Sequence, residues 1–165
     1  MTRQDLHTLI NYHYWARDRL FQAIERLTPE QYNKDLGNSF KSIRDTLTHI
    51  YAAEWAWHSR WQGVSPAALL PTDAFADFSA LRNAWLDLEK QMRAFVDGLT
   101  EEDVSRVMAY KLLSGDAGAS PIWQMVQHVV NHASYHRGQI TTMLRQIGAQ
   151  PAKSMDMIAF YRTRT

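Results

Sequence analysis

Apolar residues recur at three- and four-residue steps over four long stretches of the chain, which is the spacing of one face of an α-helix. Prolines and glycines separate these stretches and mark their ends. No alternating pattern is long enough to predict a β-strand. The pattern predicts long helices at 2–27, 42–62, 79–97 and 121–147, and a short tail helix at 155–161.

Four long amphipathic helices without strands predict an all-α fold, a four-helix bundle formed by residues 1–165 as a single domain. The connection at 63–78 is long for a hairpin between helices, so we expect a crossover between two helices that run in the same direction. Helix 79–97 has no polar residue on its apolar face, which indicates a scaffold role. Pro121 is expected as the first residue of the last helix.

Composition excludes several classes of function. The charge is balanced, with 18 Lys and Arg against 17 Asp and Glu, and no basic block predicts nucleic-acid binding. The chain has no cysteine, so disulfides, thiolate metal ligands and a cysteine nucleophile are absent. Neither a signal peptide nor an apolar run of membrane-spanning length is present, and we expect a cytoplasmic protein with no membrane partner.

The seven histidines are the main candidates for chemistry. With Ile122 at zero on a helical wheel, His136 lies at about −40°, His132 at about −80° and His128 at about −120°. Neighbours in this row are one turn apart and could share one metal ion. The pair His132 and His136 is nearer the core face, whereas His128 is expected at the margin.

The remaining histidines lie on the first two predicted helices. His49 borders the apolar stripe of helix 42–62 and could reach a neighbouring helix. His13 is expected in the core as an ordinary hydrogen-bonded side chain, and His58 and His7 are expected at the surface. A buried histidine is more often such a core residue than a metal ligand, so both interpretations stay open here.

Three neutral imidazoles without cysteine suit zinc, nickel, iron or a similar divalent ion. Three protein ligands leave a coordination position open, which is typical of catalytic sites. Protonation of the imidazoles competes with the metal, so metal affinity is expected to fall below about pH 6.5.

Gln139 could orient a ligand ring or a water. Glu54 points inward and is expected to pair with Arg17, the alternative being a general base near the metal.

Several segments resemble the DinB/YfiT-like superfamily of metalloenzymes. They are NYHYWARDRL at 11–20, SIRDTLTHIYAAEWAW at 42–57, HVVNHASYHRGQITTMLRQIG at 128–148 and MDMIAFYR at 155–162. The resemblance implies an up-down-down-up four-helix bundle. It also implies a metal site made by His49, His132 and His136, with nickel or zinc as the usual ion. Characterised relatives add a low-molecular-weight thiol such as bacillithiol to an electrophile, or are mycothiol-dependent isomerases.

We therefore expect a metal-dependent transferase or hydrolase that acts on a small molecule, with a thiol of the bacillithiol, mycothiol or glutathione type as a candidate co-substrate. The alternatives are a non-catalytic metal-binding or stress-response protein and a bundle with structural histidines. A homodimer is also expected, because Tyr51 and Trp55 lie outside the core stripe of helix 42–62 and would need a partner surface. The alternative is that the connection at 63–78 folds over these two side chains.

Overall fold

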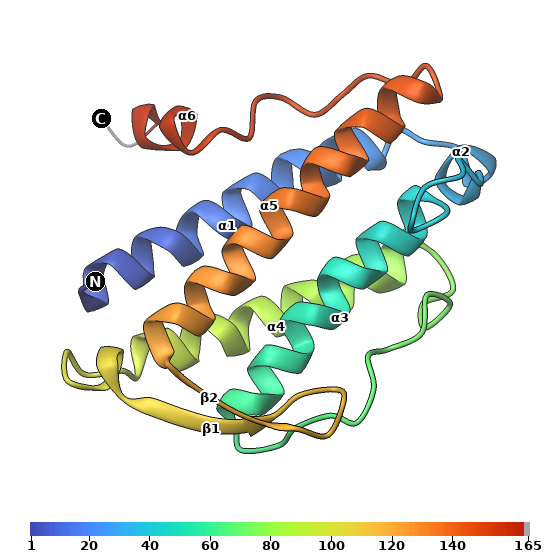
Figure 1. The fold of residues 1–165 in the computed structure, drawn as a ribbon. Coiled ribbons are helices and arrows are strands. Elements are labelled where there is room, and N and C mark those ends of the chain that lie inside the picture. Colours follow the sequence, from blue (N-terminus) through green and yellow to red (C-terminus); the bar gives the residue numbers. More distant parts are fainter. Residues whose placement is uncertain (164–165) are drawn as a thin grey trace.

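The computed structural model describes residues 1–163, which form four long helices, two short ones and one β-hairpin (Figure 1). In chain order the elements are α1 (Arg3–Ile24), α2 (Pro29–Asn33), α3 (Ile43–Trp61), α4 (Phe78–Asp97), the 3₁₀ turn η1 (Asp103–Ser105), β1 (Val107–Lys111), β2 (Ala117–Pro121), α5 (Ile122–Gln146) and α6 (Met157–Arg162).

The long helices begin where the sequence supplies an N-cap. Thr2 and Asp5 form a capping box at the start of α1, and the side chain of Ser42 accepts from the backbone N–H of Asp45 at the start of α3. Asp77 caps α4 in the same way. Each cap satisfies backbone N–H groups that have no partner inside the helix. The four long helices therefore begin and end within three residues of the predicted positions.

The long helices form the predicted bundle with up-down-down-up directions. α5 packs against α1 and α3, and α4 packs against the same two helices. Figure 1 shows α1 and α5 running one way and α3 and α4 running the other. The connection between α3 and α4 spans 62–77 and returns the chain to the starting end of α3, which confirms the predicted crossover.

The β-hairpin was not predicted. β1 pairs with β2 in antiparallel register from Val107 opposite Pro121 to Lys111 opposite Ala117. The second strand, AGASP, contains none of the β-branched or aromatic residues typical of strands, so the sequence carries little signal for it. Pro121 ends this strand and is the N-cap of α5, not its first helical residue.

Two glycines end helices as predicted. Gly63 follows α3 with φ of 83°, and Gly148 follows α5 with φ of 72°. Residues with a side chain rarely adopt this backbone conformation. Gly98 instead caps α4 in right-handed helical geometry, with φ of −77°.

Among residues 1–163, no helix is both long enough and apolar enough to span a bilayer.

Candidate metal centre

Antiparallel packing of α3 and α5 brings together three histidines that are far apart in the sequence. His49 lies on α3, and His132 and His136 lie one turn apart on α5. Ligand atoms of the three side chains lie within 4.8 Å of one another. We call these residues the three-histidine cluster. The structure thus assembles the three residues that the sequence singled out, and leaves His128 outside the group.

The nitrogen atoms of the cluster face one another. Nε2 of His49 lies 3.1 Å from Nε2 of His132. Two nitrogens bound to one tetrahedral zinc ion are about 3.3 Å apart, so this pair already has a suitable separation. The ring centroids of His49 and His136 are 4.7 Å apart, and those of His132 and His136 are 4.5 Å apart.

Burial keeps two of the rings in the neutral form that a metal requires. Desolvation, with a smaller contribution from charge on His136, lowers the pKa of His49 to about 4. Desolvation also lowers the pKa of His132 to about 3, with further repulsion from the other three histidines nearby. At neutral pH both imidazoles are therefore uncharged, and each has one ring nitrogen with a lone pair.

Gln139 fixes the orientation of the third ring. Its side-chain Oε1 lies 2.7 Å from Nδ1 of His136. Because an amide oxygen only accepts, Nδ1 donates this hydrogen bond, and Nε2 is the nitrogen left for a metal ion. Such a partner sets the tautomer and direction of a metal-ligating histidine. The role predicted for Gln139 fits this contact.

The loop before α3 covers part of the cluster. The ring of Phe40 stacks on His49 with centroids 4.2 Å apart, and meets His136 edge to face at 5.5 Å. Phe40 is half-buried and contributes to the desolvation of both rings. No sequence pattern selects this residue, because its position depends on how the loop folds back.

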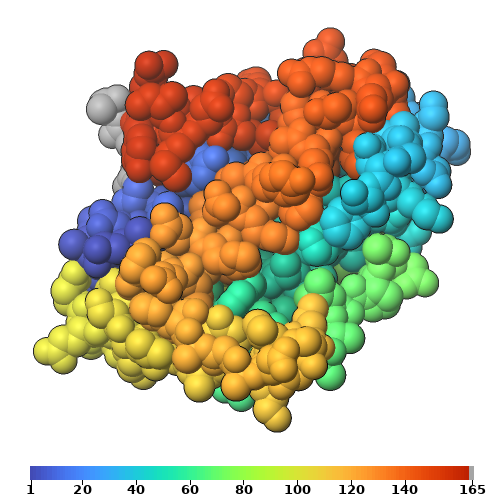
Figure 2. Space-filling model, viewed as in Figure 1, coloured from blue at the N-terminus to red at the C-terminus, as the bar shows by residue number. Residues whose placement is uncertain are grey.

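A hollow lies beside the two helices that carry the cluster. Figure 2 shows α3 as its floor, with α5, the segment before α3 and the β1–β2 hairpin around it. Beyond His132, the exposed ring of His128 packs edge to face on Trp57, with centroids 5.2 Å apart. The guanidinium of Arg60 lies 4.6 Å from the same indole.

The predicted ion pair between Glu54 and Arg17 is wrong. Glu54 is buried and accepts from three other side chains: the hydroxyl of Tyr14 at 2.6 Å, Nε1 of Trp85 at 2.7 Å and Nε2 of His13 at 2.9 Å. These partners lower the pKa of Glu54 against the opposing effect of its burial. We call these four residues the Glu54 cluster.

Arg17 has different partners. Its guanidinium donates to Asp18 at 2.7 Å and forms a close ion pair with Glu89 of α4. A helical wheel places both Arg17 and Glu54 inward, but it does not say which inward groups meet. Because every polar contact of Glu54 is made within its own cluster, the alternative of a general base beside the metal gains no support.

Three further histidines, on α1 and α3, have different surroundings. His13 is fully buried in the core, as predicted, and hydrogen-bonds to Glu54. His58 was expected at the surface but is only 9 % exposed, and burial lowers its pKa. His7 is partly exposed and lies 3.4 Å from Asp97. None of these three belongs to the three-histidine cluster.

The premise of the dimer prediction is wrong. Tyr51 is 8 % exposed, because Phe75 from the connection before α4 packs on it edge to face, with centroids 5.1 Å apart. Tyr51 also contacts Trp85 of α4. Trp55 is partly buried against the core. A homodimer stays a prediction, now without this support.

Comparison with known proteins gives a consistent result. The sequence profile of the DinB family matches residues 1–163. The chain is 27 % identical over 165 residues to Protein DinB of Bacillus subtilis (strain 168), covering 95 % of this chain and 94 % of that protein. It is 23 % identical over 146 residues to the uncharacterised protein YizA of the same organism, covering 87 % and 88 %.

Two solved structures share the fold. YfiT from Bacillus subtilis, described as a probable metal-dependent hydrolase with an unusual four-helix bundle topology, superposes with a TM-score of 0.70 at 16 % identity over 91 % of each chain. A DinB-like protein from Bacillus cereus ATCC 10987 superposes with a TM-score of 0.62 at 16 % identity, over 88 % of this chain and 95 % of the other.

Proposed function

The chain belongs to the DinB family, and from this membership and the site geometry we propose that it is a metal-dependent enzyme whose three-histidine cluster holds one divalent ion. The observation that carries the proposal is the convergence of three imidazoles whose Nε2 atoms, among the described residues, have no hydrogen-bond partner outside the cluster. His49 and His132 have only each other at Nε2, and Gln139 occupies the opposite nitrogen of His136.

The donor set fits nickel or zinc. Imidazole nitrogens suit late first-row divalent ions, and the cluster includes no carboxylate among the described residues. Three protein ligands leave positions for a water or a substrate atom. A bound ion of this kind lowers the pKa of a coordinated water or thiol and so supplies a nucleophile at neutral pH.

The substrate class is a small molecule with an electrophilic centre. The description of YfiT as a probable metal-dependent hydrolase favours hydrolysis. Addition of a low-molecular-weight thiol is the related transferase reaction, because both reactions need an activated nucleophile beside the same ion. The hollow beside α3 and α5 offers space for such a molecule (Figure 2).

Residues around the cluster have distinct roles in this proposal. Gln139 holds the ring of His136, and Phe40 excludes water from one side of His49. His128 is exposed, and its ring centroid lies 5.9 Å from that of His132. Although His128 is exposed, partial desolvation of its ring, which packs on Trp57, and the charge of Arg60 lower its pKa, so the imidazole is neutral at pH 7 and can accept a proton from substrate or water.

The test is elemental analysis of the protein purified without a histidine tag, followed by activity assays on the same sample. We expect about one nickel or zinc ion per chain, as a three-ligand site predicts. We also expect turnover of an activated ester or amide, or consumption of a thiol with an electrophile, that a chelator abolishes. A protein that carries no stoichiometric metal under any loading condition would overturn the proposal. Stoichiometric metal without turnover would overturn its catalytic part.

A further inference from the structure

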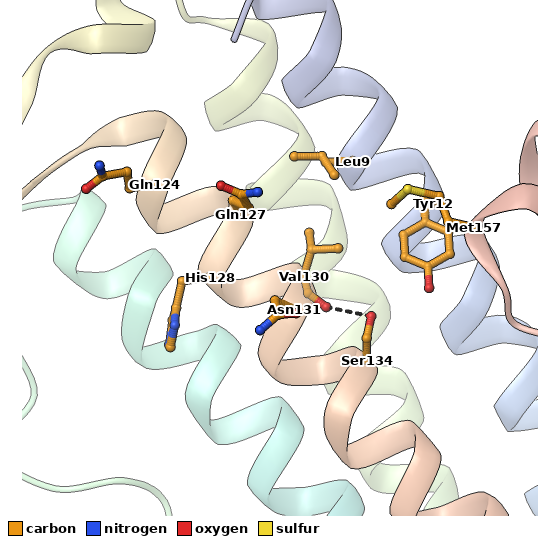
Figure 3. A pocket seen from close by; sticks show the side chains of 9 residues that line it. All are labelled: Leu9, Tyr12, Gln124, Gln127, His128, Val130, Asn131, Ser134 and Met157. Atoms are coloured by element: carbon orange, nitrogen blue, oxygen red, sulfur yellow. Dashed lines mark hydrogen bonds between the residues drawn. The ribbon is translucent and has the colours of Figure 1, made fainter.

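A groove separate from the three-histidine cluster runs between α5, α1 and the segment 152–157 that leads into α6. It consists of two adjoining pockets of about 460 and 590 Å³, which share Tyr12, Ser134 and Met157. Neither pocket is lined by a residue of the three-histidine cluster. Figure 3 shows the residues that line the first pocket, which come from α5, from α1 (Leu9 and Tyr12) and from α6 (Met157).

The second pocket has an excess of positive charge. Arg137, Arg145 and Lys153 line it, and Asp156 is the one acidic residue in its lining. Asp156 already accepts from the hydroxyl of Ser154 at 3.0 Å. Within residues 1–163, none of the three cations forms an ion pair with a carboxylate. This part of the groove therefore has two positive charges in excess.

Arg137 is the unusual member of this group because it is only 3 % exposed. One of its terminal nitrogens donates to the hydroxyl of Ser134 at 2.8 Å, and the other lies 3.4 Å from Nδ1 of His13. Both partners are neutral, as is Tyr12, whose ring centroid lies 5.6 Å from the guanidinium carbon, and His13 lies between Arg137 and the carboxylate of Glu54. A buried guanidinium without an adjacent counter-ion is unfavourable, so the position is suited to an anion that enters the pocket.

We propose that this basic pocket binds the phosphate group of a small phosphorylated molecule. A phosphate monoester carries close to two negative charges at pH 7, which matches the excess of two cations. Arginine donates two parallel hydrogen bonds to phosphate, and Arg137 is held in place for this by Ser134 and His13. Arg145 and Lys153 are exposed and close on the anion from the rim.

The adjoining pocket takes the rest of the molecule. Its lining combines the amide side chains of Gln124, Gln127 and Asn131 with the apolar surfaces of Leu9 and Val130 (Figure 3). Amides can donate to and accept from hydroxyl or carbonyl groups, whereas the apolar side chains favour a ring or a short hydrocarbon. The groove as a whole is therefore suited to an uncharged polar body attached to a phosphate.

The test is an NMR titration of the isotope-labelled full-length protein with inorganic phosphate and with phenyl phosphate. We expect saturable shifts of backbone amides at 134–145 and 152–157. The double variant Arg145→Gln/Lys153→Gln should bind about tenfold more weakly or worse, because it loses two charge-assisted contacts. Since both residues are exposed, this variant is expected to fold. Arg137→Lys tests the buried anchor and should also weaken binding.

A matched control removes two exposed lysines outside the groove. Lys34→Gln/Lys111→Gln lowers the net charge equally and should leave phosphate binding unchanged. Binding in the variant His132→Ala should also persist, which separates this pocket from the three-histidine cluster. The proposal is overturned if the control loses binding equally, if His132→Ala abolishes it, or if citrate binds as tightly as phosphate. It is also overturned if only vesicles that contain phosphatidic acid bind, since that indicates a lipid surface.

Discussion

Two groups of buried polar side chains occupy the bundle, and they differ in how their hydrogen-bonding capacity is used. In the Glu54 cluster every partner is a protein side chain, and both nitrogens of His13 are engaged, by Glu54 at 2.9 Å and by Arg137 at 3.4 Å. In the three-histidine cluster, Nε2 of His49 contacts only another imidazole nitrogen. The first group has its polar atoms paired with other core side chains, whereas the second pairs imidazole nitrogens with one another and brings three possible ligand atoms within 4.8 Å.

This difference separates a structural histidine from a candidate ligand better than burial does. His13 is fully buried and His49 and His132 are half-buried, so burial alone would select His13. A saturated polar network stabilises and orients a core. Unsaturated nitrogens on two packed helices are an arrangement that a metal ion completes.

Removing one imidazole from each group tests whether metal binding depends on the three-histidine cluster alone. Replacing His49, His132 or His136 with Ala should lower metal affinity by more than the 10–100-fold that is typical for loss of a supporting residue. Metal content after gel filtration, measured by elemental analysis, should fall from about one ion per chain to near zero. His13→Ala should leave it unchanged in the folded fraction.

His128→Ala is the matched control on α5, because His128 is in the same row but is exposed. This variant should keep most of the metal. If His128→Ala loses the metal and His136→Ala retains it, the assignment of the ligands is wrong.

Removing the carboxylate of the Glu54 cluster should affect stability and not metal binding. Glu54→Ala leaves the buried donors of His13, Tyr14 and Trp85 without their acceptor, and should cost about 3–5 kcal/mol of unfolding free energy. Urea unfolding followed by circular dichroism measures this loss. The control Glu25→Ala changes an exposed carboxylate and should cost less than about 1 kcal/mol. A loss below that value for Glu54→Ala would contradict the network.

Gln139 allows a smaller test of the three-histidine cluster. Gln139→Ala removes the acceptor for Nδ1 of His136 and should weaken metal binding by about 10–100-fold while the fold stays intact. Gln139→Glu keeps an acceptor at the same position and should restore most of the affinity. Competition with a coloured chelator measures both. Equal affinity in wild type and Gln139→Ala would show that this contact does not support the site.

A separate test concerns the pH dependence of the metal-free protein. The pKa of His49 is about 4 and that of His132 about 3, against an ordinary value of 6.5 in the unfolded chain. The unfolded chain therefore binds more protons between these values, so unfolding free energy should fall as the pH drops from about 6.5 towards about 3. The double variant His49→Gln/His132→Gln should show a shallower slope in urea unfolding.

The same pKa values lower the pH at which a bound metal is expected to be released. Free imidazole predicts competition from about pH 6.5, whereas depressed pKa values shift it towards pH 4 at His49. Retention of metal at pH 6, checked by dialysis and elemental analysis, agrees with a desolvated site. Complete loss at pH 6 contradicts it.

Periodicity in the sequence was sufficient to predict the four long helices and the inward order of His136, His132 and His128. That order is what the structure shows, from buried through half-buried to exposed. Helical wheels work here because each position depends on one regular element. The crossover at 62–77 could be predicted from the length of the connection alone. A short loop joins antiparallel helices, whereas a connection of this length can join two helices that run in the same direction.

The failures concern contacts between elements. The partner of Glu54, the cover over Tyr51 and the stacking of Phe40 on His49 all depend on side chains from other helices or loops. A helical wheel gives the direction of a side chain around the helix axis. It does not show which residues of a neighbouring helix lie at the same level, or where a connecting loop runs. The hairpin was not predicted because its second strand consists of small residues that are more often found in turns.

The distance along the chain between the proposed ligands has a consequence for unfolding. His49 and His132 are 83 residues apart, so an ion held by both would act as a removable cross-link that closes a large loop. A covalent link over a loop of this size restricts the unfolded chain by about 4–5 kcal/mol of entropy. Pulling α3 away from α5 would then require release of the ion first, so the mechanical strength of the bundle would depend on the supply of metal in its surroundings.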